Sequence, residues 1–220
     1  MRSLNEAVTY PTERDNWIPQ ILIGGFLLFL GFLLIPLFLV YGYIMLVIRS
    51  NLRGSNTPPV FENWSDLFVE GIQAWVIGLI YMLLPILILF FAVGGAIVAF
   101  LTGTDAGVIT GIGSIFGGLL LSGILALILG YIAVAALVNF AREQEFSAGF
   151  DFTSLKPVLV SSEYATAWLL SVVILLVAAV IGGMLNAIPV IGSFLGAIIG
   201  FYAFVVASVL WADGVTEASQ

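Results

Sequence analysis

The stretch from Tyr164 to Trp211 reads YATAWLLSVVILLVAAVIGGMLNAIPVIGSFLGAIIGFYAFVVASVLW and contains no charged side chain. It is long enough for two helices of about 20 residues, the length that crosses the hydrocarbon core of a bilayer. The segment NAIPVIG in its middle, residues 186–192, contains the proline and glycine that are typical of a tight turn. This stretch therefore predicts two membrane-spanning helices, Tyr164 to Asn186 and Val190 to Trp211.

Three more apolar regions precede this pair, at residues 18–48, 72–101 and 114–140. Hydrophobic residues make up 61% of the chain and charged residues 9%, whereas about a quarter of the residues in soluble domains are charged. A soluble fold of this size could not cover so much apolar surface. We therefore expect lipid to surround most of the protein. The N-terminal residues lack the pattern of a cleaved signal peptide.

The first apolar region, Ile18 to Ile48, permits two interpretations. As one straight helix it would be about 46 Å long, against about 30 Å for the hydrocarbon core. Pro36 lies in the middle of the region, and proline starts a helix more easily than it sits inside one. We expect a hairpin here, and a single tilted span is the alternative.

The predicted fold class is therefore all-α, a polytopic membrane protein with about six transmembrane helices in three hairpins, or five if the first region is one span. The polar segments divide a single membrane domain, residues 1–220, into seven parts. These are an N-terminal segment (1–17), a first hairpin (18–48), a polar loop with an amphipathic interfacial helix (49–71), a second hairpin (72–140), a polar loop (141–163), a third hairpin (164–211) and a tail (212–220).

The basic residues orient the protein. They are confined to three polar stretches and comprise Arg2, Arg14, Arg49, Arg53, Arg142 and Lys156. Short cytoplasmic loops collect Lys and Arg, so we expect both termini in the cytoplasm and the protein in the plasma membrane. The net charge of −7 provides no basic footprint for nucleic acid.

The segment from Pro59 to Trp75 shows helical spacing. Its apolar positions include Phe61, Trp64, Leu67 and Phe68, followed by Gly71, while Glu62, Asn63, Asp66 and Glu70 lie mainly off that face. We interpret it as an interfacial collar that seats the next span, with a docking surface for a basic partner as the alternative. The carboxylates recur every four residues, a spacing that favours a solvated face over a site for a hard cation.

Small residues recur every four positions in two regions. The first set is Ser114, Gly118, Ser122, Ala126 and Gly130, and the second is Gly192, Gly196 and Gly200. Such stripes let a neighbouring helix backbone approach closely in lipid. We expect packing within the chain, and a groove for substrate or a self-association face remains open.

Residue types limit the chemistry. The chain has no His and no Cys, which removes the usual general bases, thiol nucleophiles and preferred transition-metal ligands. The spans carry no charged residue to bind a coupled ion, which argues against a coupled pump. Ser161 precedes a span in the pattern of a helix N-cap, not of a nucleophile. We therefore expect no enzyme activity, no catalytic residue, no cofactor and no metal site.

Two stretches, GYIMLVIRSNLRG (42–54) and PPVFENWSDLFVEGIQAWVIGLIY (58–81), carry a resemblance. They resemble a family of multi-pass membrane proteins of unknown function that is found mainly in archaea, notably salt-loving ones. The most specific positions are Gly42, Tyr43, Arg53, Gly54, Pro59, Trp64, Leu67, Phe68 and Gly71. The resemblance implies an α-helical plasma-membrane protein from a halophilic archaeon and brings no catalytic residues.

The function that these patterns favour is that of a non-enzymatic scaffold or accessory subunit that acts through interactions. The alternative is a carrier or channel for lipid or a small neutral solute. The expected partners are the lipid bilayer and a protein at the cytoplasmic face. A homo-oligomer is left open, as is the question of whether the glycine stripes pack within or between chains.

Overall fold

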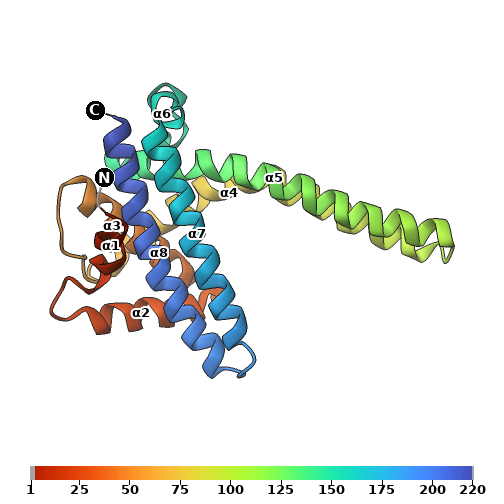
Figure 1. The fold of residues 1–220 in the computed structure, drawn as a ribbon, viewed down its shortest axis with the longest axis horizontal. Coiled ribbons are helices and arrows are strands. Elements are labelled where there is room, and N and C mark those ends of the chain that lie inside the picture. Colours follow the sequence, from red (N-terminus) through yellow and green to blue (C-terminus); the bar gives the residue numbers. More distant parts are fainter. Residues whose placement is uncertain (1–2, 220) are drawn as a thin grey trace. The chain divides into compact units, whose positions relative to one another are not determined.

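The computed structural model describes residues 3–219, and within them the protein is helical, without a β-strand (Figure 1). The elements follow the chain in this order: α1 (Leu4–Thr9), η1 (Tyr10–Thr12), α2 (Trp17–Phe29), η2 (Gly31–Leu33), α3 (Ile35–Leu52), α4 (Trp64–Leu101), α5 (Asp105–Glu143), η3 (Phe146–Phe150), α6 (Phe152–Leu159), α7 (Ser162–Leu185) and α8 (Ile191–Ala218). The η elements are short 3₁₀ helices.

Five helices in the described residues are long and apolar enough to cross a membrane: α3, α4, α5, α7 and α8. This confirms the all-α polytopic class. The predicted sixth span is not of spanning length, because α2 has 13 residues and is therefore about 20 Å long. The first arm of the expected hairpin is thus an α-helix only as far as Phe29.

The first apolar region consists of two helices and is therefore not one straight helix, but only α3 is of spanning length, so the count of five spans given with the single-span alternative is the one found. The chain breaks at residues 30–34, where Leu34 has a φ of 64°, and Pro36 lies in the first turn of α3 as its missing N–H allows. Phe29 meets Phe194 at 5.7 Å and Tyr41 meets Phe204 at 5.8 Å between ring centroids. Gly24, earlier in α2, lies against Phe201 of α8. The chain thus reverses its direction relative to α8 between α2 and α3.

The chain forms two compact units. Unit 2, residues 78–133, is a hairpin in which parts of α4 and α5 lie side by side (Figure 1). Its turn is shorter than the glycine-rich connection expected at 102–113, because the Thr104 hydroxyl accepts the Gly107 N–H and α5 already begins at Asp105. The helices are joined by hydrogen bonds of 2.8 Å from Ser114 Oγ to the Ala92 carbonyl and from Ser122 Oγ to the Pro85 carbonyl.

Unit 1, residues 1–77 and 134–220, has its core around α8. This helix packs against α2, α3 and α7, and most of its residues from Phe201 to Val215 are buried. The predicted tail from residue 212 is therefore wrong, since α8 continues to Ala218. Trp211 donates its indole N–H to Ser171 Oγ on α7 at 2.7 Å, which satisfies the polar edge of a buried ring.

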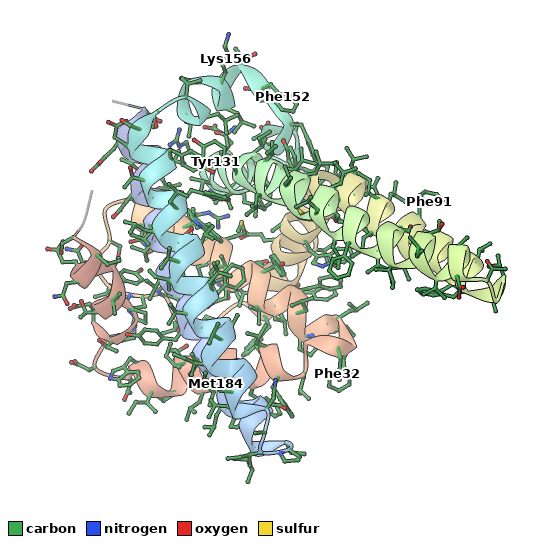
Figure 2. The ribbon with its side chains drawn as sticks, turned by 45° about the vertical axis from the view of Figure 1, so that its right-hand side comes forward. Phe32, Phe91, Tyr131, Phe152, Lys156 and Met184 are labelled. Atoms are coloured by element: carbon green, nitrogen blue, oxygen red, sulfur yellow. The ribbon has the colours of Figure 1, made fainter. Side chains whose placement is uncertain are left out.

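The link between α7 and α8 is the tight turn predicted from NAIPVIG, with α7 ending at Leu185 and α8 starting at Ile191. Side chains near this turn face outward: Met184 is 73% exposed and stands clear of α7 in Figure 2. Apolar exposure of this extent suits contact with lipid. At the other end of α7, Ser161 is the N-cap, as predicted, and accepts the Tyr164 N–H.

Candidate functional site

The segment before α4 is an extended strap held by side chains from elsewhere in unit 1. Tyr43 donates its hydroxyl to the Pro59 carbonyl at 3.1 Å, and Arg14 donates Nε–H to the Pro58 carbonyl at 2.9 Å. The Phe61 N–H donates to Gln20 Oε1 at 2.9 Å. These hydrogen bonds take the place of the backbone hydrogen bonds that a helix would form here. The amphipathic helix predicted from Pro59 is therefore wrong in its first part, and residues 59–63 lie outside any helix.

Asn63 marks the change from strap to helix. Its φ of 51° lies in the left-handed region, which Asn tolerates better than most residues. Its carbonyl accepts the N–H groups of Asp66 and Leu67 at 2.9 and 3.1 Å, which begins α4 at Trp64. The collar is therefore the first turns of a long helix and not a separate interfacial helix.

An aromatic stack supports the strap. The rings of Tyr43 and Phe61 are stacked at 4.1 Å and 11°, and Trp64 stacks on Phe61 at 5.7 Å and 20°. Phe201 of α8 lies against Phe61 at 6.1 Å. Phe61 is 8% exposed and Trp64 is 46% exposed, so Phe61 is the anchor and Trp64 is the outermost ring.

The helices α3 and α4 touch backbone to backbone beneath this stack. A Cβ added at Gly42 would collide with the Leu67 backbone, and one at Gly71 would collide with the Phe38 carbonyl. Only glycine permits this approach. Leu67 is 3% exposed, and Phe68 packs edge-on against Phe38 at 5.9 Å. Leu67 therefore belongs to the core, and Phe68 is a half-buried residue that packs between the two helices.

A charged clamp formed by Arg49 and Glu70 fixes the same two helices. Arg49 of α3 binds Glu70 of α4 through both terminal nitrogens, at 3.1 Å to Oε1 and 3.0 Å to Oε2. Its Nε–H donates to the Ala141 carbonyl near the end of α5 at 3.2 Å. A planar guanidinium can donate hydrogen bonds to a carboxylate from its two terminal nitrogens and to a carbonyl from Nε at the same time. An ammonium group does not have this planar arrangement of donors. Glu70 is thus not part of a solvated face.

The strap and the start of α4 leave a polar surface that is open to solvent. Glu62, Asn63, Trp64, Asp66 and Val69 are all exposed, and we call them the docking face. Beside them lies a cavity of about 380 Å³ whose lining includes Arg14, Arg49, Glu62, Asp66 and Glu70. Because Arg49 and Glu70 neutralise each other, the carboxylates of Glu62 and Asp66 outnumber the remaining cation, Arg14.

The small-residue candidates lie away from this face. In unit 2, Gly118 lies against Ala92, Ser122 binds Pro85, and Gly130 approaches only the end of Met82, at 3.7 Å from an added Cβ. In unit 1, Gly192 fits under the Leu185 carbonyl at the turn into α8.

The other two glycines of α8 also face helices of unit 1. Gly196 lies against Gly182 of α7, whose Cα would be 3.2 Å from an added Cβ, and Gly200 lies 3.5 Å from Leu28 of α2 by the same measure. Each small-residue candidate thus contacts its own chain.

Sequence reasoning missed the groups that hold the docking face in place. Gln20, Tyr43 and Arg49 lie in or at the end of an apolar run, 16 or more positions away from the residues that they bind. A usable signal was present for Arg49, because a charge at the end of a span needs a partner and Glu70 follows in the next polar segment.

The buried polar groups are used structurally. Within residues 3–219, every buried side-chain nitrogen or oxygen has a hydrogen-bond partner, and no group of three or more Asp or Glu residues has the arrangement of a metal site. Ser122, Ser171 and Ser208 donate to backbone carbonyls of their own or a neighbouring helix. What the site offers chemically is two exposed carboxylates, Glu62 and Asp66, in the same short segment as the exposed indole of Trp64.

Comparison with models of protein families gives a match over most of the chain. Residues 26–187, well over half of the chain, match the model of a family described as "Protein of unknown function (DUF4013)". No curated protein and no solved structure matches. The matched region contains α3 to α7 and the docking face.

Proposed function

We propose, for a chain that belongs to this family of unknown function, the role of a non-enzymatic scaffold or accessory subunit that binds another protein at the membrane. The observation that carries the proposal is the docking face, in which an exposed Trp64 is stacked on a buried Phe61 and flanked by the carboxylates of Glu62 and Asp66. Exposed aromatic residues on rigid supports are the commonest anchors of protein interfaces.

Contacts from several parts of unit 1 hold the docking face in place. The strap has hydrogen bonds to Arg14, Gln20 and Tyr43, and α4 is fixed to α3 by the glycine contact and by the Arg49–Glu70 clamp. A surface that is already ordered loses little conformational entropy on binding.

The partner that fits is a basic segment. Glu62 and Asp66 would attract Lys or Arg, and the face of Trp64 would accept a cation by a cation–π contact. We place the face in the cytoplasm at the plasma membrane, because it belongs to the polar segment that follows Arg49 and Arg53. Engagement of the buried polar groups in structural hydrogen bonds supports a role without catalysis.

The test is site-specific photo-crosslinking in native membranes. A photoreactive residue at Val69, which is exposed and carries no charge, should yield a crosslinked peptide rich in Lys and Arg, and the yield should fall at high salt and in the Trp64→Ala and Glu62→Gln variants. A photoreactive residue at Leu101, which is 81% exposed in unit 2, is the control position. Crosslinking at Val69 to lipid alone, or to segments without basic residues, would contradict the proposal.

One observation favours a carrier of lipid as a second candidate. An open groove of about 580 Å³ lies between α2, α7 and α8, lined by Leu28, Ala178, Gly182, Gly196 and other small or apolar residues. Its lining suits an acyl chain. Lipid exchange between vesicles by the reconstituted protein, lost in an Ala178→Trp variant, would favour this function.

A further inference from the structure

A second cavity in unit 1 gathers half of the basic residues of the chain. It has a volume of about 330 Å³ and is lined by Arg49, Leu52, Arg53, Arg142, Thr216 and Ser219. These residues come from α3 and its C-cap, the last turn of α5, and the end of α8. The chain as a whole has six Lys and Arg residues and thirteen Asp and Glu residues. The three arginines therefore form a basic cluster in a protein whose net charge is negative.

Within the described residues, two of the three arginines are not neutralised by a carboxylate. Arg49 is neutralised by Glu70, but Arg53 and Arg142 are exposed, and within residues 3–219 neither guanidinium forms an ion pair or a side-chain hydrogen bond. Among the described residues 3–219, none with a carboxylate side chain lines the cavity. Two guanidinium groups that share one cavity repel each other, and an anion between them would remove that cost.

The chemistry of the lining selects the anion. Guanidinium groups bind phosphate through paired N–H donors, and the hydroxyls of Thr216 and Ser219 lie in the same cavity. Basic pockets at the cytoplasmic ends of membrane helices bind the headgroups of anionic lipids. Leu52 provides an apolar wall beside the charges, which suits contact with the acyl chains of a lipid.

We propose that the cavity formed by Arg53, Arg142, Thr216 and Ser219 is a binding site for a phosphate group, supplied by the headgroup of an anionic phospholipid. The phosphate lies between the two free guanidinium groups and ties the ends of α3, α5 and α8 together. The role is independent of the docking face, which is formed by other residues.

A purely structural role for these arginines has a different consequence. Basic side chains near helix C-termini stabilise the exposed carbonyls there and need no ligand. Such a role would make the variants less stable but would give the wild-type protein no preference for anionic lipid. The experiment therefore measures lipid preference and not stability alone.

The test is native mass spectrometry of the full chain, stripped of lipid in a neutral detergent and titrated with phosphatidylglycerol or phosphatidylcholine. The wild-type protein should bind the first more tightly, and the double variant Arg53→Gln/Arg142→Gln should lose this preference, on the order of tenfold in affinity. Lys156→Gln is the matched control, because Lys156 projects from α6 into the open and lies outside the cavity (Figure 2).

Two further arms identify the source of the phosphate and protect the test against misfolding. Inorganic phosphate should compete only weakly with phosphatidylglycerol; if it binds while the lipid does not, the ligand is free phosphate. If the glutamine variant does not fold, Arg53→Lys/Arg142→Lys takes its place. This variant keeps both charges and should retain part of the preference for phosphatidylglycerol. Equal binding of the two lipids by the wild-type protein, or an unchanged preference in the double variant, would overturn the proposal.

Discussion

Arg49 and Glu70 are joined by two hydrogen bonds of 3.1 and 3.0 Å, and the Arg49 side chain is only 11% exposed. Because the pair is largely removed from water, breaking it leaves a charge with neither a partner nor full hydration. We predict that Glu70→Ala lowers the free energy of unfolding by about 3 kcal/mol. The measurement is unfolding in mixed detergent micelles, with the exposed Glu62→Ala as the control.

A double variant distinguishes the effect of an unpaired charge from the effect of lost packing. In Arg49→Met/Glu70→Leu no charge is left unpaired, so most of the stability lost in Glu70→Ala should return. If the double variant were as unstable as Glu70→Ala, the loss would come from packing and not from the charge.

The close contact of α3 and α4 gives a second prediction. An alanine at Gly71 would force its Cβ into the Phe38 carbonyl, so the helices must separate. We expect Gly71→Ala to cost about 2 kcal/mol in stability. Gly78→Ala on the same helix has open space around the added Cβ and should be neutral or slightly stabilising. Equal effects of both changes would mean that α3 and α4 do not touch here.

The aromatic stack predicts unequal roles for its rings. Phe61 is buried, so Phe61→Ala should cost about 3 kcal/mol. Trp64 is 46% exposed, and its replacement by alanine should cost no more than about 2 kcal/mol while abolishing partner binding. Thermal unfolding and crosslinking yield, measured on the same two preparations, check this. A Trp64→Ala protein that loses more stability than Phe61→Ala would show that the indole is a core residue.

The cap of α6 should be sensitive to acid. A hydrogen bond from Ser154 Oγ and the N–H groups of Thr153 and Ser154 hold the pKa of Asp151 below its ordinary value of 3.8. A lowered pKa stabilises the folded state above the ordinary value, and this stabilisation is lost as the pH falls through the lowered pKa. Hydrogen exchange of the α6 amides should therefore speed up in strong acid.

The matched control for this prediction is Asp151→Asn. Asparagine caps a helix about as well as aspartate but does not titrate. Its α6 should show no acid-dependent change beyond the intrinsic pH dependence of exchange. The same acid response in both proteins would mean that another group is responsible.

Local signals in the sequence predicted the features that depend on local structure. The turn at 186–192, the helix start near Pro36 and the N-cap at Ser161 each follow from the residues at that place. The start of α4 could not be found in this way, because Tyr43 and Gln20 hold the backbone of residues 59–61 out of a helix.

The candidate site could be predicted from the sequence only in part, because it too depends on residues that are distant along the chain. The apolar spacing of 61–68 identified the right segment, but spacing alone does not distinguish the buried Phe61 and Leu67 from the exposed Trp64. Exposure here depends on α8 and on the strap, which come from other parts of the chain. An origin in a halophilic archaeon stays a prediction.

Both proposed interactions require that the docking face and the arginine cavity open to the cytoplasm. The chain has no native cysteine, so single cysteines can be placed at Ser3, Ser55, Asp105, Ile188 and Ser219 and exposed to a membrane-impermeant maleimide on intact cells. We predict that the Asp105 and Ile188 positions react before lysis and the other three only afterwards. Labelling of Ser55 or Ser219 on intact cells would contradict this account.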